Sequence, residues 1–171
     1  MYSKWIVFHF TYSLVENMNL KISSPEATIF EGEVLKITIP TESWAITILP
    51  GHAPLVSVVK PGIISLRSNE LNQEEGKFDY VFDDKNKINL SVSKGIVFID
   101  GKNINIVTSA ATKSPKESEK ELTSMKINLE EKIVSLREKG SIEEVEKWLI
   151  ALKKIEADIE LVKIKENGVK K

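Results

Sequence analysis

The stretch ITILPGHAPLVSVVKPGII, residues 46–64, decides the fold. Two apolar runs rich in β-branched residues flank the turn PGHAP at residues 50–54, and a second turn begins at Pro61. Proline lacks a backbone donor and fixes φ, so it does not suit a helix interior or a central strand. Glycine supplies the backbone freedom that tight turns need. The stretch therefore predicts a strand, a shaped turn, a second strand, another turn and a third strand.

The same pattern extends in both directions along the chain. Short apolar runs with period two recur, and turn residues fall between them, including FEGE at residues 30–33. Alternation of this kind indicates half-buried strands, and many short strands without intervening helices indicate a sandwich or barrel. The expected strands lie at residues 35–39, 45–49, 55–59, 63–67, 78–82, 88–92, 96–100 and 104–108.

The composition changes at Ser109, where a polar segment leads into charged helix formers. Apolar residues then recur at spacings of three and four, which predicts two helices with one apolar stripe each. Gly140 suits the cap that ends the first helix, and Ser141 with Glu144 forms a capping box for the second. Two such helices with a short link predict an antiparallel hairpin that frays at ENGVKK, residues 166–171. The stripes are Leu122, Met125, Leu129, Ile133 and Leu136, then Val145, Trp148, Leu149, Leu152, Ile155, Ile159 and Val162.

The chain thus divides into three parts. Residues 18–112 form an all-β sandwich of about ten strands, and residues 113–171 form the C-terminal helical hairpin. Residues 1–17 are apolar and aromatic, but polar residues interrupt them, so they are too short and too broken to span a bilayer. We expect an extension upstream of a start at Met18, with an added edge strand as the alternative.

Composition excludes several classes of function. The 24 basic residues balance the 25 acidic ones, so no basic field favours nucleic acid. The chain has no cysteine and two histidines, His9 and His52, which excludes thiolate or histidine-rich metal sites and a thiol nucleophile. No glycine-rich phosphate loop occurs. The acidic segment 69–77 reads as a hairpin tip rather than a cation site. These observations predict a non-enzymatic protein without metal or cofactor that works through contact.

Four segments together resemble a known family. They are KISSPEATIFEGEV (21–34), ITIPTES (37–43), the opening stretch, and SKGIVFIDGKNINIVTSAAT (93–112). In this order and spacing they resemble the epsilon subunit of the bacterial F-type ATP synthase, whose mitochondrial counterpart is called delta. The resemblance implies a flattened ten-stranded sandwich joined to two helices.

The resemblance also implies a function. Such a subunit lies at the foot of the central stalk, on the cytoplasmic side of the cell membrane. It performs no chemistry, binds the gamma subunit and the c-ring, and couples proton flow to ATP synthesis. Its hairpin either folds on the sandwich or extends to the alpha and beta subunits, where it restrains ATP hydrolysis.

Two groups of residues carry these expectations. The interface with gamma or the rotor ring is expected at Glu42, Trp44, Pro50, Gly51, His52, Ala53, Pro54 and Leu55. The regulatory hairpin is expected to act through Lys147, Trp148, Lys153, Lys154, Lys163 and Lys165.

The sequence also departs from the family pattern. Trp44 and Ala45 stand where the family usually carries a Gly-Glu pair, so the carboxylate that contacts the rotor ring in the family is missing at this position, and Glu42 lies close by. The stretch KESEKEL (116–122) lacks the arginine of ATP-binding members, so no nucleotide binding is predicted.

Two other hypotheses compete with this interpretation. One is a free-standing sandwich that binds proteins and oligomerises through its hairpin. The other is an enzyme that uses His52 as a base, although the sequence places no defined nucleophile near that residue.

Overall fold

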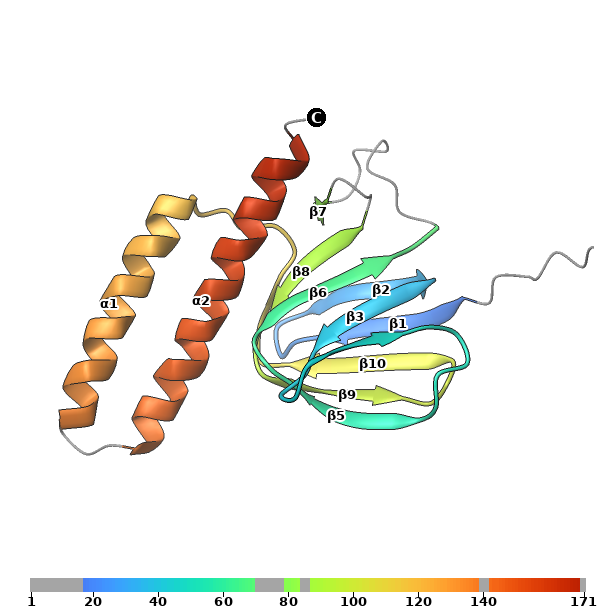
Figure 1. The fold of residues 1–171 in the computed structure, drawn as a ribbon, viewed down its shortest axis with the longest axis horizontal. Helices are drawn as coiled ribbons and strands as arrows, with labels where there is room; N and C mark the ends of the chain where they lie inside the picture. Colours follow the sequence, from blue (N-terminus) through green and yellow to red (C-terminus); the bar gives the residue numbers. More distant parts are fainter. Residues whose placement is uncertain (1–16, 70–78, 84–86, 139–141, 170–171) are drawn as a thin grey trace, which may run out of the picture.

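A computed structural model of the chain describes residues 17–69, 79–83, 87–138 and 142–169. It shows two packed β-sheets followed by two antiparallel helices, which confirms the predicted fold class (Figure 1). Residues 1–16 of the extension expected at 1–17, and most of the hairpin tip expected at 69–77, lie outside the described residues.

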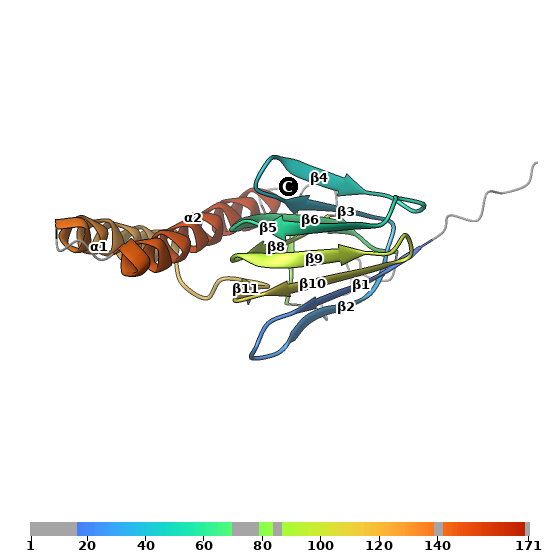
Figure 2. The ribbon, with the colours of Figure 1, turned by 90° about the horizontal axis from the view of Figure 1, so that it is seen from below.

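The sandwich consists of two sheets, here called sheet A and sheet B (Figure 2). Every strand pair is antiparallel except β1 with β10, which is parallel. Sheet A has the order β2 (Thr28–Val34), β1 (Met18–Ser23), β10 (Asn103–Thr108), β9 (Gly95–Ile99) and β5 (Leu55–Val59). Sheet B has the order β11 (Ala111–Thr112), β8 (Ile88–Val92), β6 (Gly62–Arg67), β3 (Lys36–Pro40) and β4 (Ala45–Ile48), and β7 (Val81–Phe82) pairs with β8.

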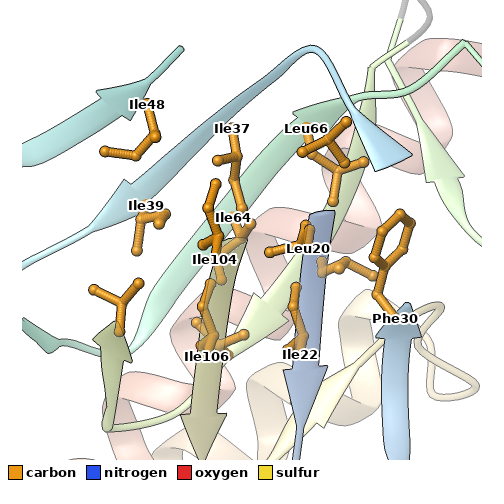
Figure 3. Packing of buried hydrophobic residues seen from close by; sticks show 14 of the residues in the cluster. Leu20, Ile22, Phe30, Ile37, Ile39, Ile48, Ile64, Leu66, Ile104 and Ile106 are labelled. Atoms are coloured by element: carbon orange, nitrogen blue, oxygen red, sulfur yellow. The ribbon is translucent and has the colours of Figure 1, made fainter. Parts of the chain in front are cut away.

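The core lies between the two sheets and consists mainly of isoleucine and leucine (Figure 3). β-Branched side chains pack well on a pleated surface, and alternate residues of each strand point to the same face. Their inward rows interdigitate, as the sequence pattern predicts. Sheet A contributes Leu20, Ile22, Ile104 and Ile106, and sheet B contributes Ile37, Ile39, Ile64 and Leu66, each of which is at most 1% exposed.

The predicted turn at FEGE is wrong, because this segment forms the middle of β2. Phe30 is buried opposite Ile22, and Gly32 lies opposite Leu20. The charged residues Glu31 and Glu33 that suggested a turn point to the outer, solvated face. The turn before β2 lies earlier, where the Ser24 N–H donates to the Ala27 carbonyl oxygen at 2.9 Å.

The hairpin consists of α1 (Glu119–Glu138) and α2 (Ile142–Val169). A capping box begins α1: the Glu121 carboxylate accepts from the Ser118 N–H at 2.8 Å, and the Glu121 N–H donates to the Ser118 hydroxyl at 3.3 Å. The sequence analysis did not find this box. The box that it predicted for the second helix begins at Ser141, which lies outside the described residues.

The predicted fraying from residue 166 is also wrong, because α2 continues to Val169. Its last turns pack on β7, where a Cβ atom on Gly168 would lie 2.6 Å from the Phe82 carbonyl oxygen. The missing side chain of Gly168 therefore allows the helix to approach the strand backbone. Contacts with the sandwich therefore keep residues 166–169 helical, although their composition alone predicts fraying.

The two helices pack on one another, but the predicted stripes are only partly buried. Leu122 and Ile133 of α1 and Leu152 and Val162 of α2 are buried, whereas Met125 is 46% exposed. Ala157 and Leu161, which lie outside the predicted stripe, are buried as well. They are explained by a second packed face of α2, which contacts β6, β7 and β8.

Candidate interaction surfaces

The outer faces of the two sheets differ in what covers them. On sheet B, α2 packs over β8, and all five residues of this strand are buried. The outward residues beneath the helix are polar: Asn89 is 2% exposed and Ser91 is fully buried. On sheet A, the outward residues of β5 and β9 are apolar and exposed. The helix α2 thus covers the polar outward residues of β8, whereas the apolar outward residues of β5 and β9 stay open to solvent.

We call the open surface on sheet A the apolar patch. Strand register makes it continuous, because Val56 pairs with Phe98, Val58 with Ile96, and Ile96 in turn with Val107. Side chains directly opposite one another on one face of a sheet are in contact distance. The exposed fractions of its members are 63% for Val56, 38% for Val58, 44% for Ile96, 46% for Phe98 and 55% for Val107.

The other half of the same face is polar and already hydrogen bonded. The Lys21 ammonium lies 3.2 Å from the Glu31 carboxylate, and the Asn19 amide donates to the Asn103 side-chain oxygen at 3.0 Å. The face therefore has an apolar half toward the β5 edge and a polar half toward β2. A contiguous exposed apolar area rimmed by polar residues marks a site of protein contact.

Glu42 lies beside this patch, as part of the loop between β3 and β4. Thr41 forms an isolated β-bridge with Val59 at the end of β5. An open hollow of about 400 Å³ is lined by the loop and the patch together, through Thr41, Glu42, Ser43, Val56, Ser57, Val58 and Ile96. Trp44, in the same loop, is 73% exposed. A large aromatic side chain held in solvent next to an apolar area is suited to anchor a partner.

The PGHAP turn lies at the opposite end of β5. Gly51 has a φ of 80°, which favours glycine, and the His52 N–H donates to the Leu49 carbonyl oxygen at 3.1 Å. The His52 ring nitrogen Nδ1 lies 2.7 Å from the Ala53 carbonyl oxygen. A hollow at this end joins Pro50 and Gly51 to Met18 at the start of β1. The predicted interface residues therefore fall into two groups that β5 separates, and Leu55 begins that strand.

Most of the predicted hairpin residues make contacts within the chain. Lys153 lies 2.7 Å from Glu156, Lys163 lies 3.3 Å from Glu119 of α1, and Lys165 donates to the Ser114 hydroxyl at 2.9 Å. The Lys132 ammonium lies 3.6 Å from the centroid of the Trp148 ring. Lys147 is exposed.

Lys154 has the most contacts of the predicted hairpin residues. Its ammonium donates to Asp158 Oδ1 at 2.6 Å, to Thr112 Oγ1 at 2.8 Å and to Ser91 Oγ at 3.1 Å. Its side chain is only 12% exposed. This lysine therefore joins α2 to sheet B.

Local hydrogen bonds shift the pKa of a few groups. Hydrogen bonds from Asn103 and Lys102 lower the pKa of Asp100, in the β9–β10 turn, from 3.8 to about 2. A hydrogen bond from the Ser118 N–H lowers the pKa of the capping residue Glu121. Between the helices, a hydrogen bond with Glu156 raises the pKa of Lys126. Each shift has a structural cause, and none prepares a group for acid–base chemistry.

The described residues offer neither a metal site nor a helix that could span a membrane. Among the parts of the chain that the structure describes, no three histidine, cysteine, aspartate or glutamate residues gather in a way that could hold a metal ion. No helix in those same parts is both long and apolar enough to cross a membrane.

Sequence reasoning missed the apolar patch, although a signal for it was present. The segments LVSVV (55–59) and IVFID (96–100) place apolar residues at both alternating positions, so both faces of the strands are apolar. Only one of these faces packs into the core, so the other is expected to be buried by a further element or by a partner.

Comparison with known proteins places the fold in a family. Residues 17–76 match the family described as ATP synthase, Delta/Epsilon chain, beta-sandwich domain. The sandwich is similar to the beta-sandwich domain of the ATP synthase delta/epsilon family. The matched residues include the PGHAP turn, β5 and the Glu42 loop, so both groups of predicted interface residues lie within the family's domain.

Individual relatives extend this similarity. An ATP synthase epsilon chain of Nitratiruptor sp. is 31% identical over 87 residues, which are 51% of this chain and 64% of that one. The match thus spans less than two thirds of the Nitratiruptor chain. An ATP synthase epsilon chain of Rickettsia bellii is 29% identical over 107 residues, 63% of this chain and 88% of that one.

A solved structure shares the fold, helices included. A chain in the cryo-EM structure of the Euglena gracilis mitochondrial ATP synthase (OSCP/F1/c-ring, rotational state 1) matches with a TM-score of 0.62 at 20% identity. The match covers 84% of this chain and 79% of that one.

Proposed function

We propose that this chain is the epsilon subunit of an F-type ATP synthase and that it binds the gamma subunit and the c-ring in the central stalk. In this role it performs no chemistry, couples proton flow to ATP synthesis, and lies at the cell membrane only through the complex. The match of residues 17–76 to the family's beta-sandwich domain supports the proposal, as do similar proteins that are themselves named ATP synthase epsilon chains.

The observation that carries the proposal is the apolar patch on sheet A. Its five members are exposed side by side, and burying such side chains contributes roughly 25 cal/mol per Å² of apolar area removed from water. A lone chain gains nothing from keeping this surface open. A permanent partner that covers it, such as gamma, gains both affinity and rigid coupling.

The two turns at the ends of β5 complete the proposed interface. The PGHAP turn is held between two prolines, so it loses little entropy when it docks. The loop with Glu42 and Trp44 borders the patch itself. We assign the patch and the Glu42–Trp44 loop to gamma and the PGHAP turn, at the far end of β5, to the c-ring.

The hairpin supplies the proposed restraint on ATP hydrolysis. In this structure it is folded on sheet B, and Lys153, Lys154, Lys163 and Lys165 all have partners within the chain. In the extended posture these lysines exchange their partners for acidic groups on the alpha and beta subunits. The folded posture is then the permissive one.

Co-purification with the cognate gamma subunit tests the proposal. Tagged full-length chain, co-expressed with gamma, is expected to elute with it at one-to-one stoichiometry, and purified c-ring is expected to join the complex. A chain that elutes without gamma at micromolar concentrations of both contradicts the proposal.

One observation favours the free-standing alternative. Ile127 and Val134, seven residues apart on α1, are 50% and 57% exposed, and such spacing places them on one helix face. Pairing of two hairpins through this face gives an oligomer. Size-exclusion chromatography with light scattering distinguishes the epsilon-subunit proposal from the free-standing alternative. The first expects a monomer that binds gamma, and the second expects an oligomer that does not bind gamma.

A further inference from the structure

The attachment of the hairpin to the sandwich centres on four side chains: Ser91 of β8, Thr112 of β11, and Lys154 and Asp158 of α2. Ser91 and Thr112 are cross-strand neighbours, so their hydroxyls lie side by side on the outer face of sheet B. The Lys154 ammonium donates to both hydroxyls and to Asp158, and the Ser91 hydroxyl donates to Asp158. All three donors of the ammonium are used.

This cluster is buried, unlike the other ion pairs of the hairpin. The side chains of Lys154 and Asp158 are 12% and 15% exposed, whereas those of Lys163 and Glu119 are 57% and 41% exposed. Surface pairs contribute little to stability, whereas a buried charge that loses its partner is strongly destabilising. The cluster therefore has far more influence on docking than the outer pairs.

The cluster connects the start of the hairpin to the middle of its second helix. Thr112 is the last residue of β11, from which the chain leaves the sandwich for α1, and Lys154 lies near the middle of α2. One ammonium thus fastens the returning helix both to the sandwich body at Ser91 and to the exit of the hairpin at Thr112. Beneath α2, the Ser65 hydroxyl donates to the Asn89 side-chain oxygen at 2.6 Å.

We propose that Ser91, Thr112, Lys154 and Asp158 form a latch that controls the release of the hairpin from the sandwich. When α2 separates from sheet B, the polar groups of the latch regain hydrogen bonds to water, and Ala157 and Leu161 of α2 become exposed. The helices keep their mutual contacts through Leu122, Ile133 and Leu152. The latch is therefore reversible, and its strength sets the fraction of chains with a released hairpin. Its regulatory consequence rests on the proposed function, but the latch itself does not.

A buried thiol measures release in the isolated full-length chain. The chain has no cysteine, and Ala157 of α2 is 4% exposed, so a thiol introduced by Ala157→Cys reacts with a modifying reagent only when α2 detaches. In this background, Lys154→Met leaves the Asp158 charge buried without its partner and is expected to speed modification about 100-fold. The matched control is Lys153→Met, which changes the adjacent, exposed lysine that bonds only within α2. It is expected to leave the rate unchanged.

A second pair of variants acts from the sandwich side and leaves both helices intact. Thr112→Val removes one acceptor of the ammonium and is expected to speed modification about 10-fold. Its control is Thr38→Val, whose hydroxyl lies 3.0 Å from that of Thr47 on the same sheet. The double variant Lys154→Met/Asp158→Leu removes both charges and is expected to react more slowly than Lys154→Met alone.

Three results overturn the latch. The first is an equal rate of thiol modification in Lys154→Met and Lys153→Met. The second is an equal rate in Thr112→Val and Thr38→Val. The third is a rate in Lys154→Met/Asp158→Leu that matches the rate in Lys154→Met alone. In a reconstituted synthase, Thr112→Val is expected to deepen inhibition of ATP hydrolysis relative to Thr38→Val. If the thiol results hold and hydrolysis does not respond, the latch stands and the proposed restraint on hydrolysis fails.

Discussion

Truncation of Phe98 tests whether the apolar patch binds gamma. Phe98 is the fourth of the five residues of β9 and pairs with Val56 on one side and Asn105 on the other. It points outward, so Phe98→Ala removes contact area without opening the core. We expect weaker binding to gamma and an unchanged sandwich.

The size of the effect follows from the exposed fraction. Phenylalanine buries roughly 200 Å² when fully covered. Phe98 is 46% exposed, so docking covers a further area of about 90 Å². At about 25 cal/mol per Å² this area contributes about 2 kcal/mol, which corresponds to a roughly 30-fold increase in Kd on truncation. Phe98→Asp, which places a charge in the contact, is expected to raise Kd by more than about 100-fold.

Isothermal titration of each full-length variant with purified gamma measures these ratios. The matched control is Asn105→Ala, a truncation of the exposed cross-strand neighbour in the polar half of the same face. It is expected to change Kd by less than about threefold, since truncations outside the centre of an interface are near neutral. An unchanged Kd for both Phe98 variants, with melting curves like that of the wild type, refutes the assignment of the patch to gamma.

Three further predictions concern the hairpin and the turns. Gly168→Ala is expected to favour release of α2, because a Cβ atom there would lie 2.6 Å from the Phe82 carbonyl oxygen in the docked state. The Ala157→Cys modification rate should rise for this variant and stay constant for Asn167→Ala, and the reverse order would count against close packing. The Asp100 carboxyl is expected to titrate by NMR with a pKa near 2, below its ordinary 3.8. Its ionised form therefore stabilises the fold above about pH 4, and this stabilisation is lost as pH falls through 2, so a midpoint near 4 would contradict the turn geometry. Ser118→Ala removes the cap of α1 and should lower helicity by circular dichroism, whereas equal helicity would show that the capping box has no effect.

The sheet and the hairpin were predictable because their signals are local. β-Branched residues at period two marked most strands, and INLSV at residues 88–92 was placed without error. The spacing of Leu122, Ile133 and Leu152 marked the contact between the helices, and all three are buried. Proline and glycine marked the turns on both sides of β5. Each of these signals depends only on residues a few positions apart.

The errors and omissions arise where tertiary contacts outweigh local composition. The charges of FEGE suggested a turn, but they line the outer face of β2, whose inward residues are apolar. The strand at residues 88–92 was expected to be half-buried, but its polar residues Asn89 and Ser91 are buried as well, since α2 covers them. The parallel pairing of β1 with β10 joins strands that lie far apart in the sequence, and no local pattern encodes it.

The candidate site was predictable in part. The sequence singled out the PGHAP turn and the Glu42–Trp44 loop as candidates but not the patch between them, although residues 55–59 and 96–100 carry apolar residues at both alternating positions. The sequence also singled out Lys154 but did not predict its contacts with Ser91, Thr112 and Asp158. A lysine four residues before an aspartate on a helix reads as a surface pair, and only the fold brings Ser91 and Thr112 to it.

The central claim is that sheet A carries the partner surface while sheet B carries the hairpin, and hydroxyl-radical footprinting of the full chain with and without gamma tests it most directly. In the complex, we expect oxidation of Val56, Ile96 and Phe98 to fall several-fold, while oxidation of Met125 and Trp148 in the hairpin stays unchanged. Protection of the hairpin residues with Phe98 still fully reactive would contradict the claim.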